Sequence, residues 1–221
     1  MTAKRKMIYG IGVNDMPVGF TNNKLYHRWK EMLSRAYSPK LHERRPSYIG
    51  SSVCEEWHTL SNFVKWTDTQ DWEGRYLDKD ILCPGNKRYS PDTCLFVSLE
   101  LNNLLCDAGQ NRGDCPKGVF YATNQGGKNG KKKYGVEMHA YGEKQRLGYY
   151  LTEQEAHRVY CEAKSAHIRE VAENLTDADT CDIERTREAL LKHAVIEGNL
   201  WRECGGETED SEADSVPTLF G

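Results

Sequence analysis

The sequence lacks long apolar runs and paired cysteines, and each absence excludes a class of protein. No apolar stretch approaches the ~20 residues needed to span a membrane, and the start MTAKRKMIYG lacks the apolar segment of a secretory signal. The eight cysteines stand singly, with no CxxC pair. Reduced thiols are therefore favoured over disulfides or a zinc knuckle, and we expect no membrane partner.

No excess of positive charge runs through the whole chain. Its 30 Lys and Arg stand against 33 Asp and Glu, a net charge of −3, which excludes a histone-like DNA binder. The charge is uneven, however, because residues 1–150 hold 23 basic against 16 acidic residues, whereas residues 151–221 hold 7 against 17. A basic body with an acidic end is compatible with phosphate binding by the body, and an ordinary charged surface is the alternative.

The most informative segment is 76–105, with the sequence YLDKDILCPGNKRYSPDTCLFVSLELNNLL. It predicts a strand, a Pro-Gly-Asn turn, a second strand and a short apolar helix. The first strand carries Asp78 and Asp80, and the helix carries Asn102 and Asn103. A hairpin closed onto one helix can direct a carboxylate and an amide at one point, and both are oxygen ligands suited to a Mg²⁺-type ion.

This segment resembles the ββα-metal core of HNH endonucleases, in particular the free-standing homing endonucleases of phages. The residues that carry the resemblance occur in the family's order, and they are Asp78, Gly85-Asn86-Lys87, Phe96-Val97-Ser98 and Asn102. In that family an Asp-His pair on the first strand supplies a metal ligand and the general base, and a helix Asn is the second ligand. The resemblance implies that Asp78, Lys79 and Asn102 are catalytic and that Asp78 and Asn102 hold Mg²⁺ or Mn²⁺, with Asn103 as the alternative helix ligand.

Lys79 is the departure from the family pattern, because it stands where the family has His. A lysine, with an unperturbed pKa near ~10.4, is a poor base at neutral pH. In a working nuclease Lys79 would be an electrostatic clamp, and Asp80, a histidine folded in from elsewhere, such as His58, or solvent would deprotonate the water. The alternative is a catalytically degenerate DNA-binding, anti-host or regulatory protein.

Upstream of this segment, the sequence predicts a basic helix and an aromatic core. The apolar spacing over residues 22–37 is helical, capped by Thr21 or Asn22 and ended before Pro39, and a loop follows. The segment 53–66 is expected to form a core that supports the hairpin through Trp57, Leu60, Phe63 and Trp66. The cations predicted to contact DNA phosphates are Lys24, Arg28, Arg35, Arg44 and Arg45, and a solvated face is the alternative.

Three short strands and a helix are predicted after a linker at 107–117. The strands cover 118–123, 133–140 and 144–150, and Thr152 caps the helix. This pattern resembles the plant ethylene-response-type DNA-binding domain, which recurs beside HNH cores in phage nucleases. The matching strings are GV at 118–119, YGVEMHA at 134–140 and LGYYLTEQEAHRVYCEA at 147–163. In that family the sheet face opposite the helix enters the major groove.

Strand alternation indicates which side chains that outer face presents. Val136, Met138 and Ala140 share one face and are expected to meet the helix. The other face and the preceding loop supply the predicted DNA-binding residues Lys131, Lys132, Lys133, His139, Lys144 and Arg146, together with the acidic Glu137. Lys131 and Lys132 are expected at phosphates rather than base edges. A sheet with a polar outer face and no ligand is the alternative.

The expected fold class is α+β: a ββα-metal (HNH-like) core followed by a three-stranded antiparallel sheet packed on one helix. The expected domains are 1–106 with the basic helix, 118–175 with the sheet, a C-terminal helix at 176–200 and a disordered acidic tail at 201–221. The tail ends in Pro-Thr-Leu-Phe, which is similar to peptides that dock on bacterial sliding clamps. We expect metal-dependent cleavage of double-stranded DNA in the cytoplasm of a bacterial host, by a phage-encoded protein.

Overall fold

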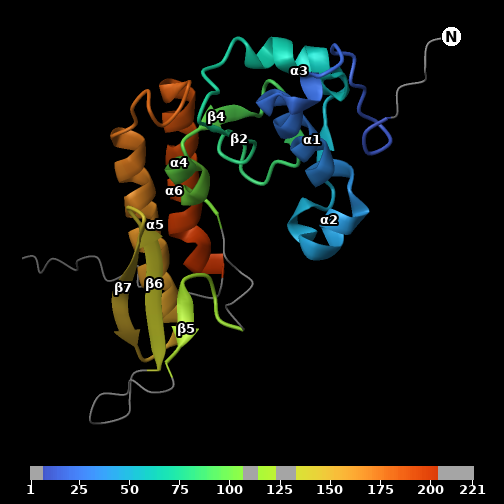
Figure 1. Cartoon of the computed structure of the whole chain (residues 1–221). Coiled ribbons are helices and arrows are strands. Elements are labelled where there is room, and N and C mark those ends of the chain that lie inside the picture. The colour runs from blue at the N-terminus through green and yellow to red at the C-terminus, as the bar shows by residue number, and fades with distance from the viewer. Residues whose placement is uncertain (1–6, 107–113, 123–132, 204–221) are drawn as a thin grey trace, which may run out of the picture.

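The fold of the chain is α+β, with three groups of elements along the sequence. The computed structural model describes residues 7–106, 114–122 and 133–203. Figure 1 shows β2, β4 and α4 between the N-terminal helices and one end of the long α5–α6 pair, with a three-stranded sheet against the other end of that pair. The predicted clamp-docking peptide and most of the acidic tail lie outside the described residues.

The N-terminal group is helical. It comprises η1 (Phe20–Asn22), α1 (Lys24–Tyr37), α2 (Pro39–Arg44), η2 (Pro46–Tyr48), η3 (Glu55–His58) and α3 (Leu60–Thr67). The predicted apolar face of α1 is buried, together with Trp57, Leu60 and Phe63, as expected. Trp66 is stacked on Phe96 with ring centroids 5.5 Å apart, so this core supports the hairpin strand.

Two details of this group differ from the sequence prediction. The cap of α1 is Asn23, whose side chain accepts a hydrogen bond from the Leu25 amide at 2.8 Å, rather than Thr21 or Asn22. The predicted loop after α1 contains the short helix α2. Pro39 begins α2 because a proline at the first helical position loses no hydrogen bond, and Ser38 caps the helix.

The hairpin group contains four short strands and one helix. The strands are β1 (Ser52–Val53), β2 (Tyr76–Asp78), β3 (Arg88–Tyr89) and β4 (Leu95–Val97), and the helix is α4 (Leu99–Leu104). β2 pairs antiparallel with β4, while β3 pairs parallel with β1. β2 and β4 therefore pair and α4 follows, but the predicted hairpin differs in one respect: β3, the strand directly after the Pro-Gly-Asn turn, pairs with β1 instead of β2.

The sheet comprises β5 (Val119–Tyr121), β6 (Tyr134–Ala140) and β7 (Glu143–Tyr150), antiparallel in the order β5-β6-β7. Val136, Met138 and Ala140 are buried against the helix, which confirms the alternation. Gly118 precedes β5 with φ +77°, and a Cβ there would meet the Tyr160 ring at 1.8 Å. The close approach of the strand to the helix therefore requires glycine at this position.

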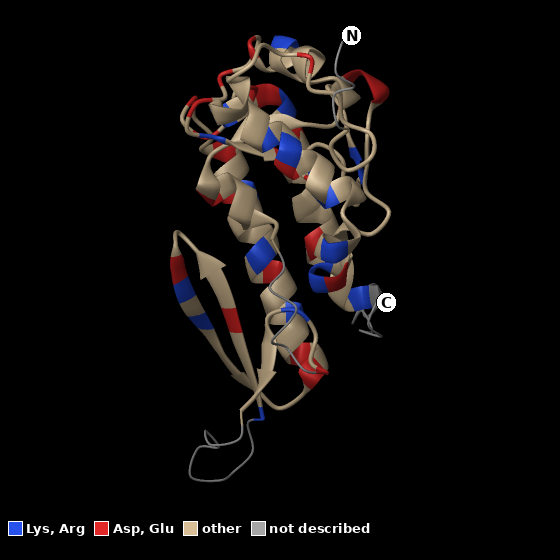
Figure 2. Cartoon of the chain, turned by 45° about the vertical axis from the view of Figure 1, so that its right-hand side comes forward, with Lys and Arg blue, Asp and Glu red and all other residues tan. Residues whose placement is uncertain are grey.

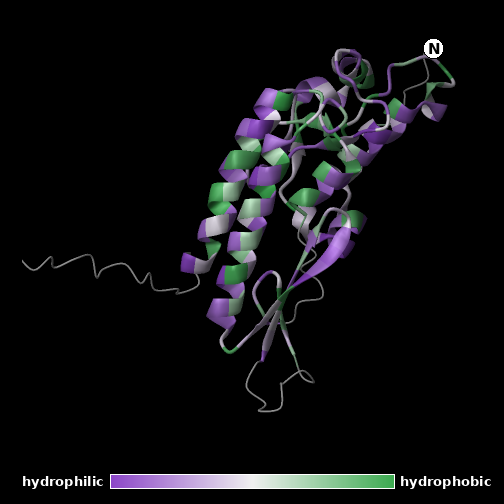
Figure 3. Cartoon of the chain, turned by 90° about the vertical axis from the view of Figure 1, so that its left-hand side faces the viewer, coloured by the Kyte–Doolittle hydropathy of each residue, from purple (hydrophilic) through white to green (hydrophobic). Residues whose placement is uncertain are grey.

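The sheet and the hairpin are both packed on the helices α5 (Glu153–Glu173) and α6 (Ile183–Glu203). Thr152 caps α5 as predicted, accepting from the Glu155 amide at 3.2 Å. The N-terminal half of α5 packs on the sheet through Ala156 and Tyr160, and the C-terminal half packs on β4 and α4 through Ile168 and Ala172. Figure 3 shows both helices with mixed hydrophilic and hydrophobic faces, as expected for helices that are buried on one side.

No helix in the described ranges is long and apolar enough to cross a membrane. Cys54 and Cys94 are buried thiols in the N-terminal core, and desolvation raises the pKa of Cys94 to about 12. These two cysteines are therefore packing residues with little thiolate character.

Candidate metal and DNA-binding sites

The ββα unit, defined as β2, β4 and α4, places Asp78 at the end of its first strand. Asp78 lies opposite Leu95 in the antiparallel register, and Ser98 caps α4 directly after β4 by accepting from the Leu101 amide at 3.2 Å. A single residue, Ser98, therefore separates the end of β4 from the start of α4. This short connection brings the helix back along the strand that carries Asp78.

The Asp78 carboxylate is held by the backbone of the following turn. Its Oδ1 accepts hydrogen bonds from the amides of Asp80 and Ile81, each at 2.8 Å. Burial raises the pKa of Asp78, and the two amide hydrogen bonds oppose that shift. Oδ2 has no hydrogen bond or ion pair within the described residues, so one carboxylate oxygen remains for a ligand.

Asn102 lies in the middle of α4, half-buried, and its side chain has no hydrogen bond to any described residue. Cys106, one turn further on, donates from Sγ to the Asn102 carbonyl at 3.2 Å. Burial and the nearby carboxylates of Asp78 and Asp80 raise the pKa of Cys106. Asp80 lies in the loop after β2 rather than on the strand, where the sequence predicts it. Asn103 is exposed, which makes Asn102 the better candidate of the two.

The donor atoms available here fit a hard divalent cation. One carboxylate oxygen and one amide oxygen are the ligand types of Mg²⁺, which usually retains several waters and uses few protein ligands. No group of three or more His, Cys, Asp or Glu side chains among the described residues is arranged to hold a metal. A fully protein-coordinated site of the zinc type is therefore not formed by these residues.

Lys79 points into the loop between β2 and β3 (residues 79–87), and its side chain is buried. Its Nζ donates to Asp80 Oδ1 at 2.5 Å and to the Asn86 carbonyl at 2.9 Å, and it lies 5.7 Å from the centre of the Tyr89 ring. These contacts fix the ammonium within the loop. They give Lys79 a structural contribution that its sequence position alone did not indicate.

Asn86 is a second residue whose role in the loop was not predicted. Its Nδ2 donates to the carbonyls of Lys79 and Arg88 at 2.9 and 2.7 Å, and its Oδ1 accepts from the Arg88 amide at 2.9 Å. The side-chain amide of Asn86 thus makes three hydrogen bonds, two as donor and one as acceptor, which join the two ends of the loop. The Gly-Asn pair in the sequence marks a turn, and such an asparagine is the usual residue to bond neighbouring backbone.

The structure separates the predicted DNA-binding residues of the N-terminal group into those that contact other side chains of the protein and those that are exposed. Arg28 is half-buried, with its guanidinium 5.5 Å from the Phe96 ring centre, and therefore contacts the hairpin. Arg35 pairs with Glu31 at 2.5 Å and lies over the Tyr48 ring. Lys24 is exposed at the start of α1.

His58, the histidine nearest in sequence to Asp78, is the candidate replacement for the missing base. Its Nε2 contacts Tyr37 Oη at 3.3 Å and the Val53 carbonyl at 3.1 Å.

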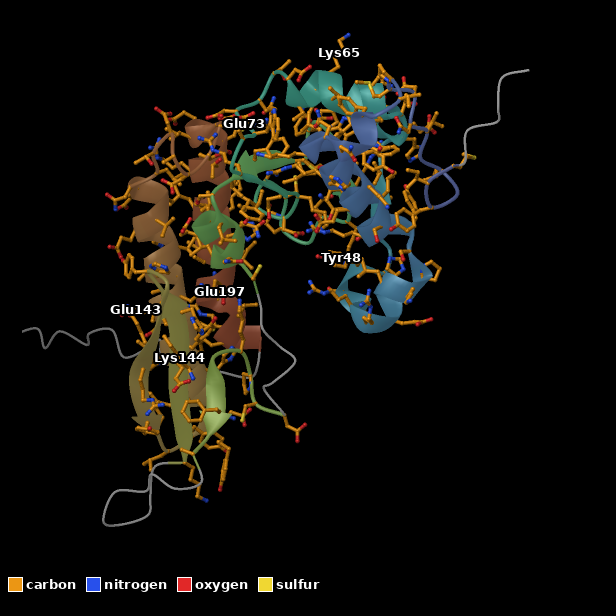
Figure 4. All side chains as sticks on the ribbon, in the orientation of Figure 1. Tyr48, Lys65, Glu73, Glu143, Lys144 and Glu197 are labelled. Carbon is orange, nitrogen blue, oxygen red and sulfur yellow. The ribbon has the colours of Figure 1, made fainter. Side chains whose placement is uncertain are left out.

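Arg44 and Arg45 border a hollow with Arg35. This arginine hollow, of about 380 Å³, is lined by Glu31, Ser34, Arg35, Leu41, Arg44, Arg45 and Tyr48. Arg44 and Arg45 are exposed and make no ion pair with a described residue. Tyr48, labelled in Figure 4, provides an aromatic wall. The hollow is suited to an anion such as a phosphate group.

The outer face of the sheet carries charges of both signs among aromatic rings. Glu137 forms ion pairs with Lys144 and Arg146, the latter with Nε to Oε1 at 3.1 Å. The Arg146 guanidinium lies over the rings of Phe120 and Tyr149, at 5.8 and 5.6 Å from their centres. Figure 2 shows both acidic and basic residues on these neighbouring strands, and Figure 4 places Lys144 on the sheet. The cations of this face are therefore already partly neutralised.

Partial burial opposes ionisation of Glu137, but hydrogen bonds from Lys144 and Arg146 outweigh it and hold the pKa of Glu137 below its ordinary value. Lys133 and His139 are exposed near these pairs. Lys131 and Lys132, predicted at phosphates, lie outside the described residues. Glu137 thus orders the two predicted DNA-binding side chains of β7.

Comparison with known proteins gave no match: no family model fits the chain, and no curated protein and no solved structure is significantly similar to it.

Proposed function

We propose that this protein is a DNA-binding endonuclease of the ββα-metal type, which cleaves phosphodiester bonds with a divalent cation. The observation that carries the proposal is the antiparallel β2–β4 pair followed at once by α4. Asp78 Oδ2 on the strand and the Asn102 amide on the helix have no hydrogen bond to any described residue. This arrangement supports the assignment of Asp78 and Asn102 as ligands of Mg²⁺ or Mn²⁺.

When bound, the cation would stabilise the leaving 3′-oxygen and the charge on the phosphate. The protein's own residues then have separate tasks. The Asp80 and Ile81 amides orient the Asp78 carboxylate. Lys79 and Asn86 hold the loop in which these two amides lie. The arginine hollow and the outer face of the sheet supply contacts to DNA phosphates and base edges.

A second function, DNA binding without cleavage, is favoured by one specific observation. The residue in the family's base position is a lysine, and its Nζ is engaged by Asp80 and Asn86 rather than directed at a substrate water. Asp78 could then serve only as a backbone cap of the turn. The two functions share the DNA-binding surfaces and differ at Asp78.

The test for cleavage uses duplex DNA of phage and bacterial origin with Mg²⁺, Mn²⁺ or Ca²⁺. We expect metal-dependent nicking by the wild type and loss of cleavage in Asp78→Ala, with DNA affinity nearly unchanged, since the metal acts on the scissile phosphate rather than on docking. Asp92→Ala is the matched control, because Asp92 is an exposed aspartate between β3 and β4. No cleavage with any of the three cations would make the binding-only function the better one.

The test for DNA binding is its salt dependence. A protein that neutralises several phosphates releases counterions, so affinity should fall by orders of magnitude between about 50 and 200 mM salt. Arg44→Ala combined with Arg45→Ala should weaken binding and reduce the salt slope. Glu43→Ala, an exposed acidic neighbour on α2, is the control and should not weaken binding. Absence of duplex binding at low salt would contradict both functions.

A further inference from the structure

His193 of α6 contacts the backbone that holds Asp78, although it lies 113 residues away from Asp80 in the sequence. Its Nε2 is 3.1 Å from the Asp80 carbonyl oxygen and 2.9 Å from the Ile81 carbonyl oxygen. Carbonyl oxygens only accept hydrogen bonds, so Nε2 must carry a proton and donate. The contact therefore fixes the tautomer of a neutral His193 ring.

One peptide group is shared between His193 and Asp78. The peptide that joins Asp80 to Ile81 accepts from His193 at its carbonyl and donates from its N–H to Asp78 Oδ1 at 2.8 Å. Hydrogen bonds in such a chain polarise one another and strengthen each other. A donor at the carbonyl end therefore strengthens the hydrogen bond at the carboxylate end.

α6 provides a rigid base for this chain of hydrogen bonds. Leu190 and Ala194, on either side of His193, are fully buried in the core that also contains Ile81. Ile81 is itself 1% exposed, so the residue that donates to Asp78 is anchored both by its side chain and by its carbonyl. The orientation of Asp78 thus depends on packing between α6 and the turn.

We infer that His193 is a positioning residue for the metal site, acting on Asp78 through the Asp80–Ile81 peptide. By fixing that peptide it holds Oδ1 in place and leaves Oδ2 in the direction required for a cation. This inference rests on the proposed function in one respect, namely that Asp78 is a metal ligand. The inference gives α6 a role at the metal site, although α6 is not part of the ββα unit.

The experiment compares full-length His193→Ala and His193→Gln with the wild type. Glutamine has an amide nitrogen that can donate to the same carbonyl oxygens, so it should rescue what alanine removes. We expect His193→Ala to lower Mn²⁺ affinity, measured by calorimetry, by about tenfold, the lower end of the range for residues that orient metal ligands. His193→Gln should remain within about threefold of the wild type, since the donor is kept.

His42→Ala is the matched control. His42 Nε2 also bonds to a backbone carbonyl, that of Arg35 at 2.8 Å, but in the N-terminal group. It should leave Mn²⁺ affinity unchanged. Hydrogen exchange at the Asp80 and Ile81 amides gives a readout that needs no metal, and we expect it to be faster in His193→Ala and near wild type in His193→Gln.

The outcomes separate the two proposals. If Asp78→Ala loses Mn²⁺ binding while His193→Ala binds like the wild type, the inference about His193 is wrong and the metal site stands. If exchange at the two amides is unchanged in His193→Ala, the hydrogen-bonded link is absent and the inference is overturned. If the wild type and Asp78→Ala bind Mn²⁺ equally, the metal assignment itself fails, and the role of His193 toward it fails with it.

Discussion

At the scale of single residues, Lys79 illustrates how one buried side chain can hold a loop in place. The Lys79 ammonium group bridges Asp80 and the Asn86 carbonyl, so it holds the two ends of the loop between β2 and β3 together. A histidine at this position is too short to reproduce both contacts. The contacts that hold this loop therefore depend on a lysine at position 79.

We predict that Lys79→Ala lowers the free energy of unfolding by about 2 kcal/mol, the usual scale for a buried hydrogen bond to a charged group. The Asn86 carbonyl and the buried ring of Tyr89 would lose their partner. Lys87→Ala is the control, because Lys87 is an exposed lysine of the same loop that also bonds a carbonyl, that of Ser47. Urea unfolding of the three proteins measures the difference, and equal midpoints would contradict the prediction.

Lys164 is a second buried cation, on α5, and it is 6% exposed. Burial and the nearby charge of Lys117 lower the pKa of Lys164, while Glu197 opposes the shift. A lysine whose folded pKa is depressed binds its proton more weakly than in the unfolded chain. Stability therefore rises as pH increases from the lowered pKa toward the ordinary value of 10.5.

We predict that Lys164→Met raises the free energy of unfolding at pH 7 by about 1 kcal/mol, since it removes the cost of desolvating the ammonium and keeps the side-chain volume. The gain should shrink as pH rises through the lowered pKa of Lys164, because the wild-type lysine loses its charge there. Lys192→Met, an exposed lysine of α6 paired with Glu188, is the control and should show no such gain. Thermal unfolding across pH 6–10 measures both effects.

At the scale of elements, the sheet shows how an acidic residue can organise a basic surface. Glu137 draws Lys144 and Arg146 together and so reduces the positive potential that DNA would meet. Arg146 is also held over two aromatic rings. The surface is preorganised, with less net charge than its lysine and arginine content suggests.

We predict that Glu137→Gln increases DNA affinity at low salt and steepens its salt dependence, because two cations become available to phosphates. Glu143→Gln, on the same strand as Lys144, is the control and should change affinity less. Binding titrations at several salt concentrations measure both. An unchanged or weakened affinity in Glu137→Gln would instead indicate that Glu137 itself contacts DNA, as an acceptor for a cytosine amine.

The same cluster should contribute to acid stability. Since the pKa of Glu137 is held below its ordinary 4.5, the stability it provides is fully present above that pH and is lost as pH falls through the lowered value. We therefore predict a smaller loss of melting temperature between pH 5 and pH 3 in Glu137→Gln than in the wild type. Glu188→Gln, with an exposed pair partner, shows how much any surface carboxylate contributes.

The elements that follow from local periodicity could be predicted from the sequence, and those that depend on distant contacts could not. The alternation of Val136, Met138 and Ala140 and the Thr152 cap depend on neighbouring residues, and both are found. The pattern does not predict α2, because Pro39 indicates the end of the preceding helix and is in fact the first residue of the next one. His193 could not be found, since nothing near it in the sequence indicates that α6 packs on the turn after β2.

At the scale of the whole molecule, α5 and α6 join the sheet to the ββα unit. Ala156 and Tyr160 belong to the core under the sheet, and Ile168 and Ala172 belong to the core under the hairpin. Gly198 of α6 allows close packing of the pair, because a Cβ there would lie 3.1 Å from Ser165 Oγ. The predicted recognition surface and the predicted metal site are therefore connected through packed helices as well as through the chain at 107–117.

We predict that inserting four glycines between residues 110 and 111 does not move the cleavage position relative to the bound sequence, because the helix pair sets that separation. Mapping cut ends on a target with a known footprint measures it. Gly198→Leu, which forces α5 and α6 apart, should give cut ends at several positions instead of one and should lower the melting temperature. A cut that shifts with the inserted length would show that the linker, not the helix pair, sets the spacing.

Under the proposed function, the helix pair would also limit the distance along DNA between the recognised bases and the cleaved bond. Ala156 and Ala172 are separated along α5 by roughly 24 Å, at a rise of about 1.5 Å per residue. B-form DNA covers that length in about seven base-pair steps of roughly 3.4 Å. Under the proposed function, the protein would therefore cut within a single turn of the double helix from the bases that it recognises.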